Sequence, residues 1–273
     1  MRGEINQSKK YIYRFLLFQC MSNNEQSLIY PTVTSIMEHP NPDIRERWLK
    51  KYGKPGFSFT EGLYAQSFPI DWIFPPQKTK RWKWLAEAFP PRVAQFLFET
   101  YVEGSNLVLL DLFSGIGGWS LGAFWSRKFK KIIMVEKDKD KCRYLHLNFD
   151  RLGIEYEVIC MDVRKIGPMN IDVISASPPC EDLTILRHLS GSNPKKGTIP
   201  LTMFTTQYVN QTKPKIAFYE NVYHEDLVEI LKKHGWTVEK FDMSKIIPQQ
   251  RKRLIGIYYP SKQTTIDFYT IMR

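Results

Sequence analysis

A cysteine that follows two prolines carries the clearest chemical signal in the chain. The segment Ser177-Pro-Pro-Cys180 closes an apolar stretch at residues 172–177, and proline rings fix the backbone so that the thiol is presented in one geometry. A thiolate held in this way is a good nucleophile. The competing interpretation is structural, because a free cysteine is commonly a small buried hydrophobic residue.

Glycines and acids elsewhere could hold a small cofactor. Asp111-Leu-Phe-Ser-Gly-Ile-Gly-Gly118 links an apolar stretch to a helical pattern, and its glycines let the backbone turn tightly at a helix N-terminus. Glu136 and Asp162 follow the next two apolar stretches. Carboxylates repel phosphates but accept hydrogen bonds from ribose hydroxyls and an adenine amine, which favours an adenosine pocket. Solvated strand ends are the alternative for both acids.

These residues fall at the ends of segments that we expect to be strands. Buried strands are predicted at 107–111, 131–136, 157–161, 172–177, 216–220, 237–241 and 254–259. Helices are predicted at 119–127, 139–152, 201–212 and 225–234. The alternation predicts an α/β fold with a mostly parallel sheet of about seven strands and helices on both faces. Ligands bind at the carboxyl ends of such strands, which brings Cys180 and the acid of Tyr219-Glu220-Asn221-Val222 to one edge.

Composition favours a polyanionic partner. The 273 residues carry 39 Lys and Arg against 28 Asp and Glu, a formal net charge of +11. Such an excess suits nucleic acid or an acidic membrane surface. Residues 183–219 and 243–266 each contain five Lys or Arg and no acid, and both flank the expected catalytic edge, although a charge run is often only a solvated face.

The lengths of the apolar runs and the spacing of the cysteines indicate where in the cell the protein is expected. No run approaches the roughly 20 residues that span a bilayer, and Arg14 interrupts the apolar N-terminal stretch at residues 11–20. We therefore expect a cytoplasmic protein, in a prokaryote or in the host cytoplasm of a virus, that is neither secreted nor bound to membranes. Cysteines at 20, 142, 160 and 180 lack metal-ligand spacing, which predicts free thiols and no metal.

Four segments, in order, resemble the S-adenosylmethionine-dependent DNA (cytosine-5) methyltransferases. They are the glycine loop ending at Gly118, Pro178-Pro-Cys180, Glu220-Asn-Val222 and Gln249-x-Arg-x-Arg253. The resemblance implies a Rossmann-like class I methyltransferase sheet. It also implies that S-adenosylmethionine is held by Phe113, Gly115, Ile116, Gly117, Gly118, Glu136, Asp162, Val163 and Pro178, with Glu136 on the ribose and Asp162 near the adenine amine.

The front of the chain resembles the end of that family. Residues 59–72 resemble its penultimate motif and residues 81–94 its last one, so the motif order is circularly permuted, which is allowed where natural termini lie close together. We divide the chain into a small irregular N-terminal segment (1–57), the permuted motifs packing on the catalytic domain (58–104) and that domain itself (105–273). Departures from the family pattern are Glu87 after Ala86, Lys137 and Glu181.

The resemblance also implies a covalent mechanism on a cytosine that is flipped out of the duplex. Cys180 would add to C6 of the base, and Glu220 would hydrogen-bond N3 and the exocyclic amine. Arg253 would hold the base carbonyl, while Arg251 would brace the cysteine loop or a phosphate. An RNA cytosine methyltransferase with the same chemistry and a catalytically inactive nucleic-acid-binding homologue are the alternatives.

Permutation leaves little chain for reading DNA sequence. The family's recognition region would fall where this chain is cut open, so only residues 1–57 and 260–273 remain for it. We expect either a short recognition sequence read by the N-terminal segment or a separate specificity partner. In the first case five basic residues would lie mainly on phosphates: Arg45, Arg47, Lys50, Lys51 and Lys54.

Overall fold

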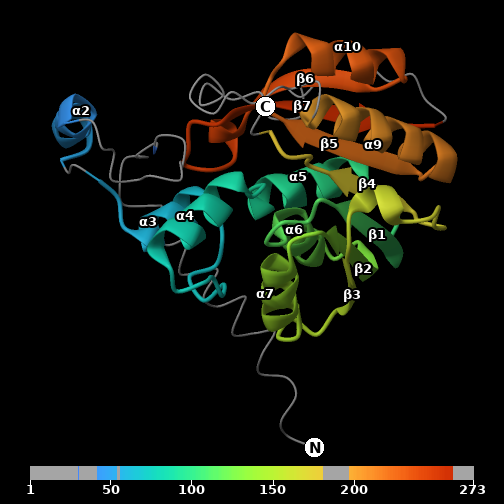
Figure 1. Cartoon of the computed structure of the whole chain (residues 1–273), viewed down its shortest axis with the longest axis horizontal. Coiled ribbons are helices and arrows are strands. Elements are labelled where there is room, and N and C mark those ends of the chain that lie inside the picture. Colours follow the sequence, from blue (N-terminus) through green and yellow to red (C-terminus); the bar gives the residue numbers. More distant parts are fainter. Residues whose placement is uncertain (1–29, 31–41, 54–55, 181–196, 261–273) are drawn as a thin grey trace, which may run out of the picture.

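One seven-stranded sheet forms the centre of the protein (Figure 1). The computed structural model describes residues 30, 42–53, 56–180 and 197–260. The strands are β1 (Leu107–Leu112), β2 (Phe129–Glu136), β3 (Glu155–Cys160), β4 (Val173–Ala176), β5 (Ile216–Asn221), β6 (Thr237–Asp242) and β7 (Lys252–Tyr258). Their order is β3-β2-β1-β4-β5-β7-β6. All seven predicted strands are confirmed, with bounds that shift by one or two residues.

The sheet is parallel except at β7. β3, β2, β1, β4 and β5 pair in parallel, and β7 runs antiparallel to both β5 and β6. β4 and β5 are buried along their whole length, as expected for central strands covered on both faces. The predicted α/β class and mostly parallel sheet are therefore confirmed.

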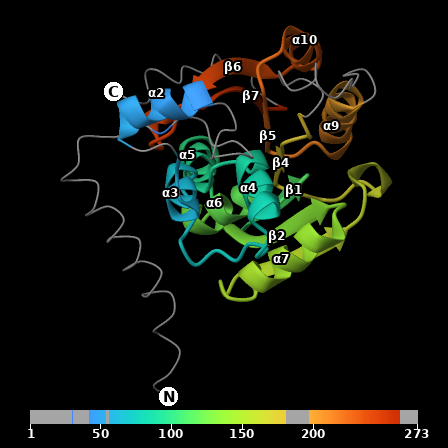
Figure 2. The same ribbon diagram turned by 60° about the vertical axis from the view of Figure 1, so that its left-hand side comes forward.

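Helices cover both faces. On one face pack α4 (Lys78–Glu87), α5 (Pro91–Tyr101), α6 (Gly118–Ser126) and α7 (Lys139–Phe149); on the other lie α9 (Thr198–Thr212) and α10 (Glu225–Lys233). Neighbouring strand residues divide between the two layers: Leu109 joins the first core and Leu110 the second. Figure 2 shows α9 and α10 on the opposite side of the strands from α7.

The front of the chain packs into the first layer. α3 (Phe59–Ala65) begins with a capping box in which Ser58 and Glu61 satisfy each other's backbone N–H groups. α5 contacts α6 at a glycine, since a Cβ on Gly122 would lie 2.4 Å from the Cβ of Ala94. The Phe89 ring stacks on Trp119 with centroids 3.9 Å apart. These contacts pack residues of the front segment against the sheet domain.

The expectation of free thiols is wrong for two cysteines. Cys142 and Cys160 form a disulfide with Cα atoms 6.0 Å apart. The prediction considered only local spacing, whereas the parallel β2–β3 pairing sets Cys160 opposite Glu136, just before α7 begins. Cys180 is the free cysteine in the described part of the chain, and Cys20 lies outside that part.

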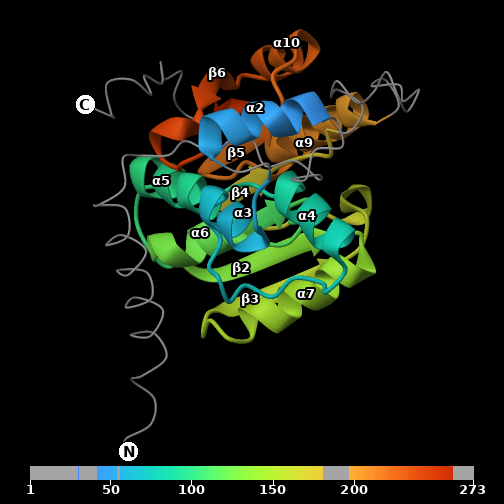
Figure 3. The ribbon, with the colours of Figure 1, turned by 90° about the vertical axis from the view of Figure 1, so that its left-hand side faces the viewer.

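α2 (Pro42–Tyr52) stands apart from the sheet, at the left-hand end of the molecule in Figure 1, and it faces the viewer in Figure 3. Tyr30 forms an isolated parallel bridge with Gln249, and its ring lies 5.4 Å from that of Phe57. Trp48 of α2 contacts the same Phe57 ring at 5.6 Å. Within the described ranges, no helix combines the length and apolarity needed to cross a membrane.

Candidate active site

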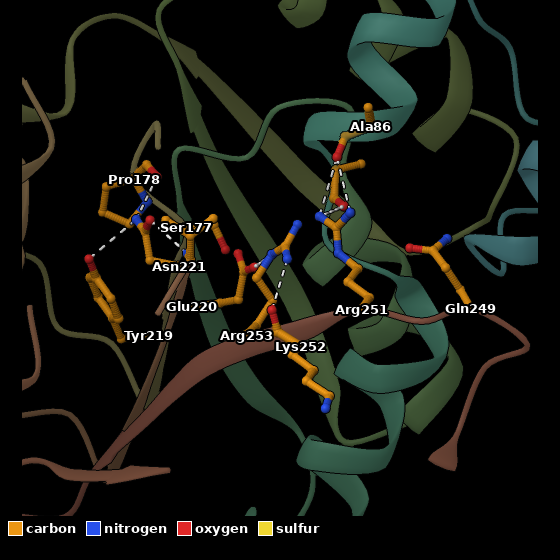
Figure 4. Close-up of polar contacts among 12 residues, drawn as sticks. Ala86, Ser177, Pro178, Tyr219, Glu220, Asn221, Gln249, Arg251, Lys252 and Arg253 are labelled. Carbon is orange, nitrogen blue, oxygen red and sulfur yellow. Dashed lines mark hydrogen bonds and ion pairs between the residues drawn. The ribbon is translucent and has the colours of Figure 1, made fainter. Parts of the chain in front are cut away.

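The thiol loop follows β4 and is fixed through its carbonyl oxygens. Pro178 and Pro179 have no N–H to donate. Asn221 Nδ2 donates to the Pro178 carbonyl oxygen at 3.0 Å, as Figure 4 shows, and Thr198 Oγ1 donates to that of Pro179 at 2.7 Å. Cys180 is half-buried at the end of this loop.

A carboxylate and a guanidinium lie beside the thiol loop. β4 and β5 pair in parallel up to Ala176 and Tyr219, so the residues that follow, which include Glu220, meet at one sheet edge. Glu220 is only 6% exposed, and its Oε1 lies 3.3 Å from Nε of Arg253 on β7. Figure 4 shows the two side chains directed toward each other. The structure thus brings together the predicted nucleophile, acid and arginine.

The electrostatic environment holds the thiol in its neutral form. Burial raises the pKa of Cys180, and the charge of Glu220 raises it further. The guanidiniums of Arg253 and Arg251 act in the opposite direction. The nucleophilic thiolate is therefore a minor species at neutral pH.

Arg251 holds the end of a helix. Its guanidinium donates to the carbonyl oxygens of Ala86 and Ala88, at 3.2–3.3 Å, where α4 ends. Burial lowers its pKa to about 9, so it stays charged at neutral pH. A cation at these carbonyls satisfies orphan acceptors and complements the helix dipole. The sequence predicted that Arg251 braces the cysteine loop or a phosphate, and this role stays a prediction. Its hydrogen bonds join the residue before β7 to the front segment, and its charge also acts on Cys180.

Gln249 makes a second tie of the same kind. Its Nε2 donates to Oε1 of Gln66 at 2.8 Å, and Gln66 Nε2 donates to the carbonyl oxygens of Leu85 and Ala88. All three glutamine contacts are buried. Residues 183 positions apart in the chain are therefore joined at the arginine motif.

The glycine loop after β1 has the geometry of a ligand cradle. Phe113, Gly115 and Gly117 have φ of 60°, 58° and 86°, the left-handed region that glycine adopts without strain. A Cβ on Gly117 would lie 2.8 Å from the Phe149 ring, whereas a Cβ on Gly115 would meet no atom closer than 4.0 Å. Open space thus faces Gly115, while the next three residues of the loop are buried: Ile116, Gly117 and Gly118.

The two acids of the expected adenosine pocket differ in their partners. Glu136 is buried and accepts hydrogen bonds from the backbone N–H groups of Gly115 and Asp138, both at 2.9 Å. Asp162 is partly exposed and paired with Arg164 at 2.5 Å. This pairing and the charge of Lys137 hold the Asp162 pKa well below its usual range. Both carboxylates lie at the ends of adjacent strands as predicted.

Two departures from the family pattern have visible consequences. Lys137, where the family often has an apolar residue, is exposed and directly follows Glu136 of the expected adenosine pocket. Glu87 forms an ion pair with Lys141 of α7 at 2.9 Å, and its charge contributes to raising the Cys180 pKa. Glu181 lies outside the described residues. Val163 is buried in the short helix η1 (Val163–Lys165) after Asp162.

Sequence reasoning missed a buried carboxyl group beneath the glycine loop. Asp111 at the end of β1 is fully buried and accepts hydrogen bonds from Ser120 Oγ at 2.6 Å and Ser175 Oγ at 2.9 Å. Burial raises its pKa to about 7. It joins β1, α6 and β4 at the point where the loop begins. An acid inside the apolar run at residues 107–112 was the available signal.

Comparison with known proteins assigns the family. A sheet of this order, with one reversed strand and a glycine loop after β1, defines a Rossmann-like methyltransferase fold. The family model described as C-5 cytosine-specific DNA methylase matches residues 107–266, more than half of the chain. The protein therefore belongs to the C-5 cytosine-specific DNA methylases, as its motifs predicted.

Individual relatives are distant. The chain is 30% identical over 121 residues to the type II methyltransferase M.AquIA of Picosynechococcus, covering 42% of this chain and 48% of that protein. It is 26% identical over 186 residues to the type II methyltransferase M.Eco47II of Escherichia coli, covering 59% and 43%. A solved methyltransferase of Pyrococcus furiosus superposes with a TM-score of 0.49 at 16% identity, over 74% of this chain and 94% of that one. The chain spans about half the length or less of the curated relatives that it matches.

Alkylation of Cys180 should depend on pH in a way that Glu220 sets. Because the raised pKa makes the thiolate scarce, the rate of alkylation by iodoacetamide should rise from neutral to alkaline pH. Glu220→Gln removes a negative charge, so the midpoint of this profile should move to lower pH. Peptide mass spectrometry measures Cys180 separately from the other cysteines. Glu229→Gln on α10 is the control, because that carboxylate is exposed to solvent. A midpoint that stays fixed in Glu220→Gln would contradict the electrostatic assignment.

Proposed function

We propose that the protein transfers the methyl group of S-adenosylmethionine to C5 of cytosine in DNA, through a covalent bond between Cys180 and C6. The observation that carries this proposal is the placement of a free thiol and a buried carboxylate at the ends of adjacent strands β4 and β5. Family membership of residues 107–266 supports the same chemistry.

Each reacting group has a task in this mechanism. The Cys180 thiolate forms a bond to C6, and the electron pair of the C5–C6 double bond becomes available at C5. Glu220 in its protonated form donates to N3 and accepts from the exocyclic amine, so that charge developing on the ring is stabilised. After C5 has gained the methyl group it loses its proton to a base, and the bond between sulfur and C6 breaks.

Arg253 has two roles in this proposal. In the structure it neutralises Glu220 at 3.3 Å, which keeps both side chains oriented within the site. With a base bound, a guanidinium in this position can donate to the ring carbonyl as well as to Glu220, because it carries five N–H donors. A buried pair of this kind orients the site more than it stabilises the fold.

The glycine loop and Glu136 fit S-adenosylmethionine. This cofactor supplies an electrophilic methyl group when bound. The open space in front of Gly115 is bordered by the Glu136 carboxylate, which the N–H of Gly115 already fixes. The ribose hydroxyls would donate to Glu136, and Asp162 would accept from the adenine amine. In the described part of the chain, no group of three or more His, Cys, Asp or Glu could hold a metal ion.

The front of the chain supports the permuted order. Residues 58–104 lie outside the match to the family model, yet Arg251 and Gln249 are bound to them. α5 contacts α6 closely at Gly122 and ends shortly before β1. We therefore assign residues 59–72 and 81–94 to the family's last two motifs, moved to the front.

α2 is our candidate for contact with the DNA backbone. Tyr30, Trp48 and Phe57 attach it beside Gln249, which precedes the arginines of the site. Arg45, Arg47 and Lys50 are exposed on this helix. Lysine and arginine at phosphates set affinity without specifying sequence. Sequence choice would then come from the rest of residues 1–57, as a short site, or from a separate specificity partner.

A DNA duplex with 5-fluorocytosine at its target should trap the enzyme covalently. The fluorine at C5 cannot leave as a proton does, so the bond between Cys180 and C6 persists after methyl transfer. A denaturing gel should show the adduct with wild type and S-adenosylmethionine, and none with Cys180→Ser. An equal adduct with the serine variant would refute the nucleophile. A fluorinated RNA of the same sequence tests the RNA alternative, and trapping of RNA alone would overturn the DNA substrate.

Glu136→Gln should weaken S-adenosylmethionine binding about ten-fold to a hundred-fold, because one charge-assisted hydrogen bond is lost. Isothermal titration calorimetry measures the dissociation constant. Glu157→Gln on β3 is the control, since its half-exposed carboxylate pairs with Lys131 on the neighbouring strand β2. Unchanged affinity in Glu136→Gln would mean that this acid only supports the backbone of the loop.

The triple variant Arg45→Ala, Arg47→Ala, Lys50→Ala should bind duplex DNA more weakly and with a shallower salt dependence. Loss of three phosphate contacts lowers the slope of log affinity against log salt by about three. Fluorescence anisotropy at several salt concentrations measures both quantities. The control replaces Lys130, Lys232 and Lys233, which are exposed near the amino ends of β2 and β6. If both triple variants lose affinity equally, α2 has no special role.

A further inference from the structure

The backbone that carries the thiol depends on two outside donors. Two consecutive prolines leave the middle of the loop without N–H groups, so the position of this part is set by what its carbonyl oxygens accept. Asn221 supplies one donor, from β5. Thr198, the first residue of α9, supplies the other across 19 positions of sequence. Both donors are almost fully buried, at 2% and 1% exposure.

The Thr198 hydroxyl donates to a residue outside its own helix. Hydroxyls at a helix start commonly cap free N–H groups of the first turn, but here the cap position is Gly197 and no side-chain cap bond is present. Thr205 and Thr206 in the same helix are also buried, and they bond the helix's own carbonyls of Leu201 and Met203. Thr198 instead reaches to Pro179.

A chain of hydroxyls links the two donors. Thr202 Oγ1 donates to the Thr198 carbonyl oxygen at 2.9 Å and lies 2.8 Å from the Tyr219 hydroxyl. Asn221 Nδ2 lies 3.4 Å from the same hydroxyl. One consistent set of directions runs from Asn221 to Tyr219, Thr202 and the Thr198 carbonyl. Burial raises the pKa of Tyr219 well above the usual value of a tyrosine, so this hydroxyl keeps its proton.

We propose that Thr198, supported by Thr202 and Tyr219, is a positioning residue that fixes the Pro179 carbonyl and thereby holds the Cys180 thiol opposite Glu220. This inference rests on the proposed function and adds residues that its motifs do not contain. The thiol must approach C6 along one direction, and a displacement of about 1 Å can reduce a rate about a hundred-fold. A single buried hydroxyl can therefore matter more for turnover than for folding.

Thr198→Val removes the donor with little change of shape, and Thr198→Ser retains it. With a DNA duplex as substrate, kcat should fall about ten-fold or more in Thr198→Val, while KM for DNA and the dissociation constant of S-adenosylmethionine should stay within about two-fold. Thr198→Ser should restore kcat to near the wild-type value. Thr205→Val is the matched control, because it also removes a buried hydroxyl from α9 but leaves the Pro179 contact intact.

The rate of covalent trapping on 5-fluorocytosine DNA provides a second readout. Thr198→Val should form the adduct more slowly than Thr205→Val, although both should bind DNA equally. Tyr219→Phe leaves Thr198 in place but breaks the chain behind it, so it should lower kcat by a smaller factor. Combined with Thr198→Val it should add little further loss, because both changes act on the same set of hydrogen bonds that holds the Pro179 carbonyl.

The outcomes separate this inference from the proposed function. If wild type neither methylates DNA nor forms an adduct, the proposed function fails. If wild type is active and Thr198→Val matches it, the positioning role is overturned while the function stands. Equal loss in Thr198→Val and Thr205→Val would also overturn it, as a general effect on α9. If circular dichroism shows that Thr198→Val does not fold, the comparison of Tyr219→Phe with Thr205→Val tests the proposal instead. Equal kcat in those two variants would refute the positioning role.

Discussion

Parallel pairing of β4 with β5 is the constraint on which the site depends. Parallel strands need a crossover between them, and α9 lies in the crossover from β4 to β5, so 39 residues separate Ala176 at the end of β4 from Ile216 at the start of β5. Because the two strands are parallel, their carboxyl ends lie at the same edge of the sheet. Cys180 and Glu220 become neighbours because of this pairing and not because of any local sequence. The reversed β7 then brings arginines to the same edge from the opposite direction.

Burial at this edge makes every polar contact consequential. Glu220 and Arg253 are both largely withdrawn from water, and an ion pair in such a place costs desolvation energy that a good geometry only offsets. The same withdrawal raises the pKa of Cys180.

The sequence was informative wherever a pattern is local. Period and turn residues located β1 to β7, and the prolines, glycines and acids at strand ends located Cys180, Glu220 and Glu136. Contacts that arise only from packing were not readable. The disulfide of Cys142 with Cys160 needs the β2–β3 register, and the contact of Arg251 with Ala86 joins residues 165 apart. Thr198 was invisible for the same reason, because a threonine at a helix start is ordinarily a cap.

The joint between the front segment and β7 has a consequence for how the protein can be divided. A fragment that began at residue 105 would contain every strand that the structure describes and the proposed reacting groups, yet Arg251 would lose the helix carbonyls that receive its charge. The close contacts at Gly118 and Gly122 would become an uncovered apolar groove on α6. The front segment therefore belongs to the same folding unit as the sheet domain and covers one side of it. Two separately made pieces, joined only by these contacts, would recover activity only by finding each other in solution.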